Sequence, residues 1–432
     1  MKFTNEISIV NLNDDCLLHI FEYLALKDRV SLDLVCQRWK RLCSLLWKKV
    51  DVFDVCSKEV DYAYSMLKSE DDINVLACEG VFKKCFRNSK IVNLSRIEGL
   101  ESTTLMDLWH YCSCHFGYQN APTGTLNTLR NVLLKCERLE ELWLCQCVVD
   151  VDDVFLSQLF AKNRNLRKLI LTEYKLTGEC FSNLFVKKLD TLILFGCIIQ
   201  NRQHLNSAVS RASKLRTLSV SGCSLDPHTL ETVNSPVSSR NLKGYDENGF
   251  YEYRCGLLYN ICKLKNLTIL GLRNSGLSDN MMKIISLSCT NLKVLIIDSC
   301  ERIREDGLRY TASMPNLKCL DIGYIDRIAD IGLLGVNKNL HVLRMNYTSF
   351  CDIAILRVLS EMKILQELDI SGCRHLGDDF VESAIEIVKL RKDKIPLEIG
   401  LHDTNVSLMA ISNICSLVQL NFDYSVNYEK YC

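Results

Sequence analysis

Short stretches in which leucines alternate with variable residues recur along most of the chain. In Leu139 to Cys147, leucines take the first, fourth and sixth positions and cysteine the ninth. Further copies, close or loose, begin at Leu166, Leu189, Leu215, Leu267, Leu292, Leu317, Leu340, Leu365 and Leu417. With degenerate copies near Leu242 and Lys394, the period is about 25 residues. The alternation predicts a short strand in each copy, with Leu142 and Leu144 facing the core and Trp143 and Cys145 facing away.

Between successive strands, the apolar residues show the spacing of a helix. Met281, Ile284, Ile285 and Leu287 lie roughly on one helical face. Aspartates that can cap helices stand near the expected helix starts, at Asp279, Asp306, Asp330 and Asp378. One strand and one helix per repeat predict an α/β solenoid that curves, with parallel strands on the concave face and helices outside.

Residues 292–308 read Leu-x-x-Leu-x-Ile-x-x-Cys-x-x-Ile-x-x-x-Gly-Leu. This pattern resembles the cysteine-containing subclass of leucine-rich repeats, which is common in one family of ubiquitin-ligase receptors. We expect about a dozen repeats over residues 51–432. Before residue 138 they are divergent, with a strand at residues 91–94 and a helix at 125–136. The irregular stretch 232–262 is either a degenerate repeat with a longer connection or a projecting binding loop.

A different pattern occupies residues 10–50, which we expect to form a small all-helical domain. Asn13 or Asp14 can cap a first helix, and Asp28 a second. One apolar stripe contains Leu17, Ile20, Phe21 and Leu24, and another contains Val35, Trp39, Leu42 and Leu46. Three short helices of about 40 residues in total have too little core to bury all of this surface. Part of it must therefore face the solenoid or another protein.

These residues resemble an F-box, the segment by which substrate receptors dock onto the adaptor of SCF ubiquitin ligases. The family pattern is matched at Leu12, Leu17, Ile20, Phe21, Leu24, Asp28, Val35, Cys36, Arg38 and Trp39. Asn13 replaces the family's proline, which fixes the entry to the first helix, but asparagine also caps helices well. The resemblance implies that all of these positions except Arg38 bind a Skp-family adaptor. The alternative is a helical cap that closes the end of the solenoid.

Charge and hydropathy narrow the classes of partner. Lysine plus arginine and aspartate plus glutamate each total 52, which argues against a nucleic-acid surface. No apolar run approaches the roughly 18 residues that span a bilayer, and the start of the chain does not resemble a secretory signal. We therefore expect a cytoplasmic or nuclear protein without a membrane partner. The 23 cysteines, mostly at repeat positions, are predicted to be reduced and buried.

Candidate catalytic groups are scattered at repeat offsets instead of gathered, and no phosphate-binding loop or zinc-protease helix is present in the sequence. The densest metal-like cluster contains His110, Cys112, Cys114 and His115, and a Cys-x-Cys pair follows at Cys145 and Cys147. Neighbouring ligands on a strand point to opposite faces, which disfavours zinc. We expect no cofactor, no metal and no catalytic residue.

The residues that flank the inward leucines are expected to face solvent on the concave side and to bind a protein. In early repeats they are apolar, at Trp143, Ile170, Ile193 and Phe195. In later repeats they are charged and mainly acidic, at Arg273, Asp298, Asp321, Arg344, Asp369 and Asp423. Rigid aromatic anchors and an acidic stretch would suit a target that carries apolar and basic groups.

The resemblance and the repeats together favour a non-catalytic substrate receptor of an SCF-type ubiquitin ligase. Its helices would hold the Skp-family adaptor and, through it, a cullin, and its solenoid would present a protein for ubiquitination and proteasomal degradation. The alternative is a leucine-rich scaffold or inhibitor that acts without ubiquitin transfer.

Overall fold

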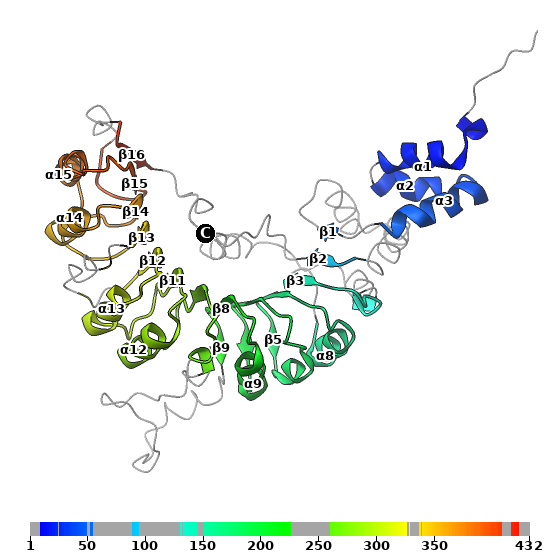
Figure 1. The fold of residues 1–432 in the computed structure, drawn as a ribbon, viewed down its shortest axis with the longest axis horizontal. Helices are drawn as coiled ribbons and strands as arrows, with labels where there is room; N and C mark the ends of the chain where they lie inside the picture. Colours follow the sequence, from blue (N-terminus) through cyan, green and yellow to red (C-terminus); the bar gives the residue numbers. More distant parts are fainter. Residues whose placement is uncertain are drawn as a thin grey trace, which may run out of the picture. The chain divides into compact units, whose positions relative to one another are not determined.

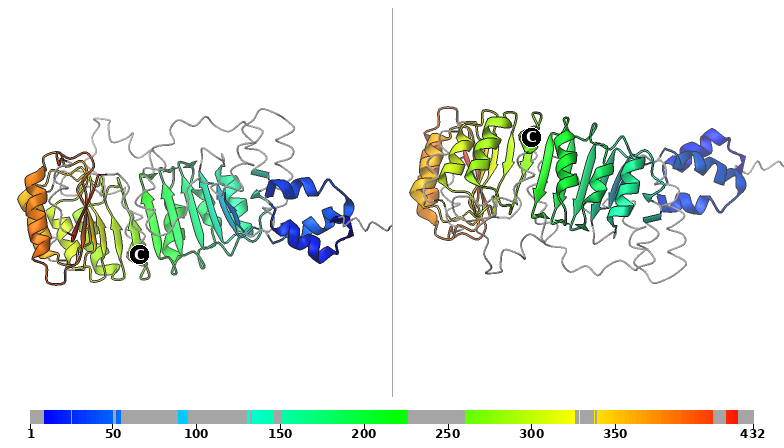
Figure 2. Two further views of the ribbon diagram at one scale, coloured as in Figure 1. Left: turned by 90° about the horizontal axis from the view of Figure 1, so that it is seen from above. Right: turned by 90° about the horizontal axis from the view of Figure 1, so that it is seen from below.

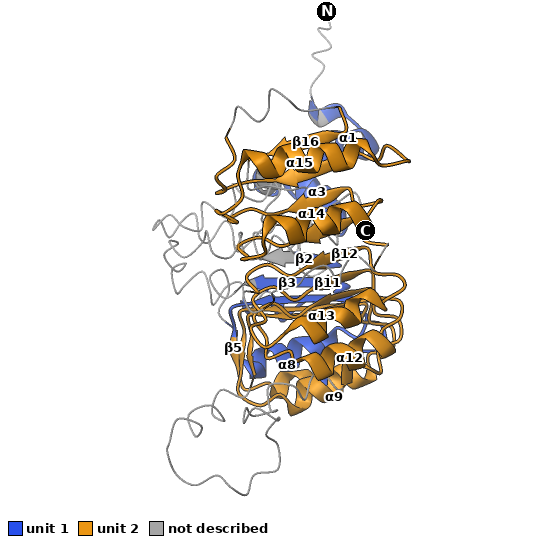
Figure 3. Cartoon of the chain, turned by 90° about the vertical axis from the view of Figure 1, so that its left-hand side faces the viewer, with its two compact units in different colours: residues 1–98, 115–174, 183–188 blue, residues 99–114, 175–182, 189–432 orange. Residues whose placement is uncertain are grey.

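A computed structural model shows a small group of helices followed by repeated strands and helices (Figure 1). It describes residues 9–24, 26–49, 52–54, 89–94, 130–131, 133–145, 151–225, 260–325, 328, 337, 339–407 and 416–422. Two compact units are described separately (Figure 3). Unit 1 contains residues 1–98, 115–174 and 183–188, and unit 2 contains residues 99–114, 175–182 and 189–432.

The N-terminal helices are a short 3-10 turn, η1 (Ile9–Asn11), followed by α1 (Asp14–Glu22), α2 (Leu26–Leu32) and α3 (Gln37–Trp47). Asn13 caps α1, because its side chain accepts a hydrogen bond from the backbone N–H of Cys16 at 2.8 Å. Cys36 takes the same place before α3, where its Sγ accepts from the N–H of Trp39. The predicted asparagine cap is thus confirmed and supplies the helix entry that proline provides in the family pattern.

Unit 1 continues with parallel strands that pair in sequence order. They are β1 (Val52–Asp54), β2 (Ile91–Leu94), β3 (Glu141–Cys145) and β4 (Lys168–Thr172), with helix α8 (Asp153–Lys162) between the last two. The divergent strand expected at residues 91–94 is confirmed by β2. Of the helix expected at 125–136, only residues 130, 131 and 133 are described as helical.

Unit 2 carries further strands, which also pair in parallel (Figure 2). They are β6 (Thr191–Phe195), β8 (Thr217–Ser221), β10 (Ile269–Gly271), β11 (Val294–Ile296), β12 (Cys319–Asp321), β13 (Val342–Arg344), β14 (Glu367–Asp369), β15 (Leu397–Gly400) and β16 (Val418–Asn421). The helices are α9 (Gln203–Arg211), α12 (Asp279–Ser288), α13 (Glu305–Ala312), α14 (Asp352–Glu361) and α15 (Asp378–Lys389). Figure 1 shows the helices of unit 2 along the outer side of its arc and the strands along the inner side. The predicted leucine-rich-repeat fold is confirmed.

The strand register pairs leucine with leucine, so the buried positions form continuous rows. Leu270 lies opposite Leu295, which lies opposite Leu320, and the row continues through Leu343 and Leu368. All five side chains are fully buried against the helix side. Because a shift of one residue would turn each row to the other face, this burial fixes the register.

Two features of unit 2 were not expected from the sequence. Residues 179–183 form a 3-10 helix, η2 (Glu179–Asn183), in place of an α-helix. The turns after three strands pair with each other as a second small sheet of β5 (Lys175–Leu176), β7 (Ile198–Ile199) and β9 (Ser224–Leu225). Single apolar pairs in turns carry too short a pattern for such strands to be recognised.

Polar side chains join each repeat to the next. The side-chain amides of Asn291 and Asn316 donate to carbonyls one repeat earlier, at 2.9 and 2.8 Å. Asp279 was expected to cap its own helix, but its Oδ1 accepts from the N–H of Arg304, just before the following helix. Asp378 likewise accepts from the N–H and hydroxyl of Ser407. Of the four predicted cap residues, Asp279 and Asp378 therefore bind across repeats, Asp306 lies 3.7 Å from Arg309 of its own helix, and Asp330 lies outside the described residues.

Most repeat cysteines are buried, as predicted, whereas Cys223 and Cys262 are half-buried and Cys16, Cys36 and Cys351 are exposed. Cys300 and Cys373 are buried, and each thiol donates to a backbone carbonyl of the preceding repeat, Leu272 at 3.0 Å and Met345 at 3.5 Å. The thirteen cysteines whose side chains the structure describes are all free thiols. Within the described residues, no helix has both the length and the apolar character needed to cross a bilayer.

Candidate functional site

The core of the N-terminal helices is built from the two predicted apolar stripes. Leu17 and Phe21 of α1 are buried, as are Leu42 and Leu46 of α3. The ring of Trp39 meets that of Phe21 edge to face, with centroids 4.9 Å apart. These contacts hold α1 against α3 and leave other apolar residues of the segment outside.

Several large apolar side chains of the N-terminal helices face solvent. Leu34 is 86% exposed, Tyr23 79%, Val35 58% and Ile20 39%. Ile9 and Leu45 are also exposed. Exposed apolar side chains of this size, when several occur on one small element, are typical of protein-binding sites, because isolated soluble domains rarely keep them in water. We call Ile20, Tyr23, Leu34 and Val35 the apolar surface.

Charged side chains fix the angle between α1 and α3. The Nε of Arg38 donates to Oδ1 of Asp14 at 2.8 Å, and its Nη2 donates to the carbonyl of Leu12 at 2.6 Å. Arg41 binds the other carboxylate oxygen of Asp14 at 2.8 Å. The hydrogen bond from Arg38 lowers the pKa of Asp14. Arg38 thus has a structural role as the link that keeps the apolar surface in place.

The residues predicted to bind the adaptor divide into core and surface. Leu17 and Phe21 have no exposed surface to offer, so they can act only by holding the helices together. Ile20 and Val35 are exposed, Asp28 and Cys36 are exposed, and Leu12, Leu24 and Trp39 are half-buried. Tyr23 and Leu34 were missed, because the helical periodicity identifies one buried stripe and does not reveal which apolar residues lie outside it.

The apolar strand residues that were expected to face solvent do not. Trp143 is only 7% exposed, and Ile170, Ile193 and Phe195 are buried as well. Trp143 and Ile170 lie opposite each other in the register of β3 and β4, so each covers its neighbour. Strands about 4.8 Å apart leave large side chains in mutual contact even on the face that carries no helix. The expectation of exposed apolar anchors was wrong.

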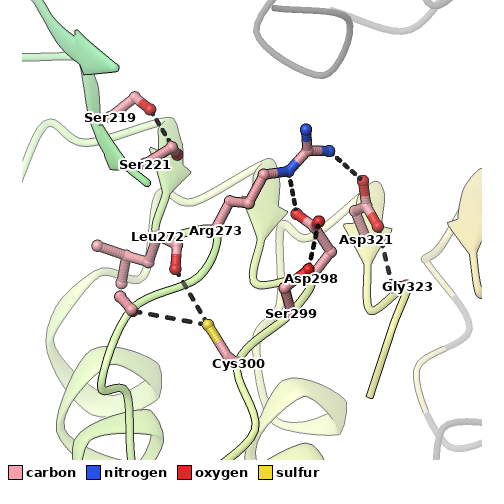
Figure 4. Close-up of polar contacts among 10 residues, drawn as sticks. Ser219, Ser221, Leu272, Arg273, Asp298, Ser299, Cys300, Asp321 and Gly323 are labelled. Carbon is pink, nitrogen blue, oxygen red and sulfur yellow. Dashed lines mark hydrogen bonds and ion pairs between the residues drawn. The ribbon is translucent and has the colours of Figure 1, made fainter. Parts of the chain in front are cut away.

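The charged strand residues form a paired row, not a solvated acidic stretch. We define the charge row as Arg273, Asp298, Asp321, Arg344 and Asp369. The Nε of Arg273 donates to Oδ1 of Asp298 at 2.6 Å, and its Nη2 lies 3.8 Å from Oδ2 of Asp321 (Figure 4). Asp321, Arg344 and Asp369 are opposite one another in the register of β12, β13 and β14. Across these three strands an arginine thus lies between two aspartates, whereas Asp298 and Asp321 are neighbouring acids that share Arg273.

Burial has the largest effect on the pKa values of the acids in the charge row. Asp298, Asp321, Arg344 and Asp369 are all less than a tenth exposed. Burial, followed by the repulsion of Asp321, raises the pKa of Asp298 to about 7, even though Arg273 opposes the shift. Burial likewise raises the pKa of Asp321. Burial is the largest cause of both raised pKa values, and the repulsion between neighbouring carboxylates adds to it.

Several expectations fall on residues that the structure does not describe, among them the irregular stretch 232–262 as far as residue 259. Asp423, the last predicted acidic position, lies outside the described residues, as does the His110 to His115 cluster. Among the residues that are described, no group of three histidine, cysteine or acidic side chains could hold a metal. Burial raises the pKa of Cys300 to about 12 and that of Cys289 to about 11, which is the opposite of an activated thiol.

Comparison with known proteins identifies the N-terminal segment. Residues 11–52 match the family model described as F-box-like. The human F-box/LRR-repeat protein 12 is 47% identical over 47 residues, a match that covers 10% of this chain and 14% of the human protein. The chain thus spans only a small part of that curated relative.

Solved structures resemble the chain more broadly but at low identity. Yeast Rad7, in its complex with Elc1, is 14% identical with a TM-score of 0.46, covering 85% of this chain and 96% of that one. An internalin (InlF) of Listeria monocytogenes is 18% identical with a TM-score of 0.35, covering 69% and 89% respectively. With its F-box-like segment at residues 11–52 and its leucine-rich-repeat fold, the chain has the organisation of an F-box/LRR protein.

Proposed function

We propose that this chain is the substrate-recognition subunit of an SCF-type ubiquitin ligase. The N-terminal helices bind a Skp-family adaptor and, through it, a cullin, and the repeats hold a target protein for ubiquitination and proteasomal degradation. The chain contributes position and no bond chemistry, since a bound target reacts faster when its lysines are held near the ubiquitin thioester of another subunit.

The apolar surface of the N-terminal helices is the observation that carries this proposal. A cap that merely closed a solenoid would turn its apolar residues inward, against the repeats. Here Leu34 and Tyr23 are more than three-quarters exposed, and Val35 follows directly at the start of the link to α3. Leu34 and Val35 precede the Cys36 to Trp39 motif, so the F-box-like match and the exposed surface coincide.

The second candidate function is a leucine-rich scaffold without ubiquitin transfer. The residues of the charge row pair with one another, so this face already has charge partners within the chain. That pairing favours the scaffold. The two functions differ in one property, the binding of an adaptor by the N-terminal helices.

Adaptor binding tests the proposal directly. The intact chain is expected to co-purify with a Skp-family adaptor and a cullin, and the double variant Leu34→Asp, Val35→Asp should reduce this at least tenfold. Both positions are exposed, so the helices should still fold, which circular dichroism and resistance to proteolysis can establish. Leu17 and Phe21 are unsuitable for this purpose because charged residues there would unfold the segment.

A matched control lies on the outer helices. Leu287 of α12 and Ile353 of α14 are 70% and 75% exposed, and aspartate at both should leave co-purification unchanged. Failure of the intact, folded chain to bind any Skp-family adaptor would contradict the receptor role and favour the scaffold. Equal loss in both double variants would show that exposed apolar residues in general, and not the apolar surface, cause the association.

A further inference from the structure

The amino ends of the strands in unit 2 lie at a rim that is rich in lysine and arginine. The residue just before each strand belongs to a ladder, in which each backbone N–H donates to the carbonyl of the preceding repeat at 2.7 to 2.8 Å. Six successive members of this ladder are Asp190, Arg216, Thr268, Lys293, Lys318 and His341. Because neighbouring strands are about 4.8 Å apart, Lys293 and Lys318 follow each other at that spacing.

Further bases stand in the turns beside the ladder. We define the basic rim as Lys214, Arg216, Lys263, Lys265, Lys293 and Lys318. Lys318 is half-buried and the other five are exposed. In the part of the chain that the structure describes, none of these six side chains makes an ion pair. The positive charge of the rim is therefore not neutralised within the described chain.

The acids of the same repeats lie at the opposite end of the strands. Over residues 203–225 and 260–320, the acids are Asp279, Asp298, Glu301, Glu305 and Asp306. Asp298 follows β11, and the other four lie in or just before the first turns of α12 and α13. The rim is therefore basic, although 52 bases and 52 acids balance over the whole chain.

The fold does not require bases in this ladder. Asp190 occupies the position before Arg216, so an acid is accommodated there. Like charges that lie directly opposite each other on neighbouring strands are destabilising, and Lys293 and Lys318 are placed in this way. Acids and bases in alternation would remove the repulsion without disturbing the core, since these side chains are not buried. The packing of the repeats therefore does not explain why bases stand here.

Helix ends account for only part of the rim. Cations near the C-terminus of a helix are favourable, because they complement its last carbonyls. Lys265 has this role, since its Nζ lies 3.5 Å from the carbonyl oxygen of Ser288, the last residue of α12. Among the described contacts, the side chains of the other five make no such bond to a helix end. These five can bind an anion from outside the chain.

We propose that the basic rim binds an acidic segment, rich in aspartate and glutamate, of a protein ligand. A single exposed ion pair is weak, but a segment with several carboxylates can meet several of these cations at once. The turns that carry the rim, at residues 211–216, 260–268, 288–293 and 312–318, contain no aromatic ring on which the bases of a single-stranded nucleic acid could stack. A protein segment therefore suits the rim better.

The inference rests on the proposed function, because the ligand is the target protein that the repeats would hold. It gives this target a chemical character, an exposed acidic segment. The binding itself requires no adaptor, so the two proposals can be tested separately.

Peptide binding to the full chain tests the rim. The probe is a fluorescein-labelled peptide of alternating glutamate and serine, measured by fluorescence anisotropy. A peptide with glutamine in place of glutamate has a similar size without the charge. At low salt, we expect the glutamate peptide to bind at least tenfold more tightly than the glutamine peptide. This difference should become several times smaller at high salt, because exposed charges are screened.

Charge reversal locates the binding on the rim. The double variant Lys293→Glu, Lys318→Glu should weaken binding of the glutamate peptide at least tenfold, whereas Lys293→Arg, Lys318→Arg keeps both charges and should bind as the wild type does. Thermal unfolding establishes that each variant is folded. If the first variant has a lower thermal midpoint than the wild type, Lys214→Glu, Arg216→Glu replaces it, since both of these side chains are exposed.

A matched control lies on the outer helices. Lys283 of α12 and Arg309 of α13 are exposed, and Lys283→Glu, Arg309→Glu changes the net charge by the same amount as the rim variant. This control should weaken peptide binding less than twofold. Equal loss in the rim variant and the control would show that net charge alone attracts the peptide, and would overturn the proposal.

Two other results would also contradict it. Equal affinity of the glutamate and glutamine peptides would show that the rim binds no acidic segment. Tighter binding of a single-stranded oligonucleotide with the same number of charges, lost in the rim variant, would assign the rim to nucleic acid. Co-purification of the adaptor with Lys293→Glu, Lys318→Glu is measured in parallel and should be unchanged, so failure of the rim and failure of the receptor role remain distinct.

Discussion

The N-terminal helices and the strand face of unit 2 distribute apolar and charged side chains in opposite ways. The helices leave large apolar residues such as Leu34 in water and pair their charges, Arg38 with Asp14, at the surface. The strand face instead buries its charges, and Asp321 and Asp298 are almost inaccessible. Residue type alone is therefore a poor guide to which side chains meet a partner. What matters is whether neighbouring elements of the same chain already cover them.

The largest expected effect separates core from surface within the N-terminal helices. Leu17→Asp puts a carboxylate into a site with no exposure, so it should destabilise the helices by about 3 kcal/mol or more. Leu34→Asp, at an exposed position, should change the free energy of unfolding by no more than about 0.5 kcal/mol. Urea unfolding measures both when it is followed by tryptophan fluorescence, to which Trp39 and Trp47 of these helices contribute. Similar losses would show that Leu34 is covered within the chain.

The next effect concerns the charge row. Arg273→Met leaves Asp298 and Asp321 buried without their shared partner and should cost about 3 kcal/mol, because a buried carboxylate that loses its cation is expensive. Arg374→Met breaks a pair with Asp403 in which the arginine is largely exposed, and should have little effect. Thermal unfolding of both variants at low and high salt provides the comparison. If Arg374→Met proved the more harmful, the row would not be the buried cluster described above.

The smallest effect is a dependence on pH. The pKa of Asp298 is raised from 3.8 to about 7 in the folded protein, so this carboxyl binds a proton more tightly when folded. Its contribution to stability is complete below about pH 4 and is lost as the pH rises through 7. Asp298→Asn should remove this loss and be more stable than the wild type at pH 8, by about 1 to 2 kcal/mol, with a smaller difference at pH 5.

Other acids titrate in the opposite sense. Hydrogen bonds lower the pKa of Asp14, Asp378 and Asp403, and their contributions are lost as the pH falls. These three acids are present in the wild type and in Asp298→Asn alike. The difference between the free energies of unfolding of the two proteins therefore reports on the carboxyl of Asp298 alone. An unchanged difference between pH 5 and pH 8 would mean that Asp298 is ionised throughout this range.

The repeat pattern was sufficient to predict the parallel strands, the outer helices and the buried cysteines. Leucine spacing reports on the core, and the core determines register. The side chains of the opposite face were harder to place. Trp143 and Asp321 occupy outward positions in the alternation, yet each is covered by the neighbouring strand, and that neighbour lies more than twenty residues away in sequence. Such coverage depends on which residues meet across repeats.

Prediction from the sequence meets the same limit at the N-terminal helices. The F-box-like motif could be read from Leu12 to Trp39, but whether Phe21 or Leu34 faces a partner follows only from the packing of α1 on α3.

The bonds that Asp279 and Asp378 make have a consequence for synthesis of the chain. Each carboxylate belongs to an earlier repeat and accepts an N–H from a later one, Arg304 or Ser407. As the chain leaves the ribosome, a new repeat therefore meets an acceptor that is already in place. The order of translation and the order of these two contacts coincide, so the repeats that carry Asp279 and Asp378 offer an acceptor to the repeat that is made after them.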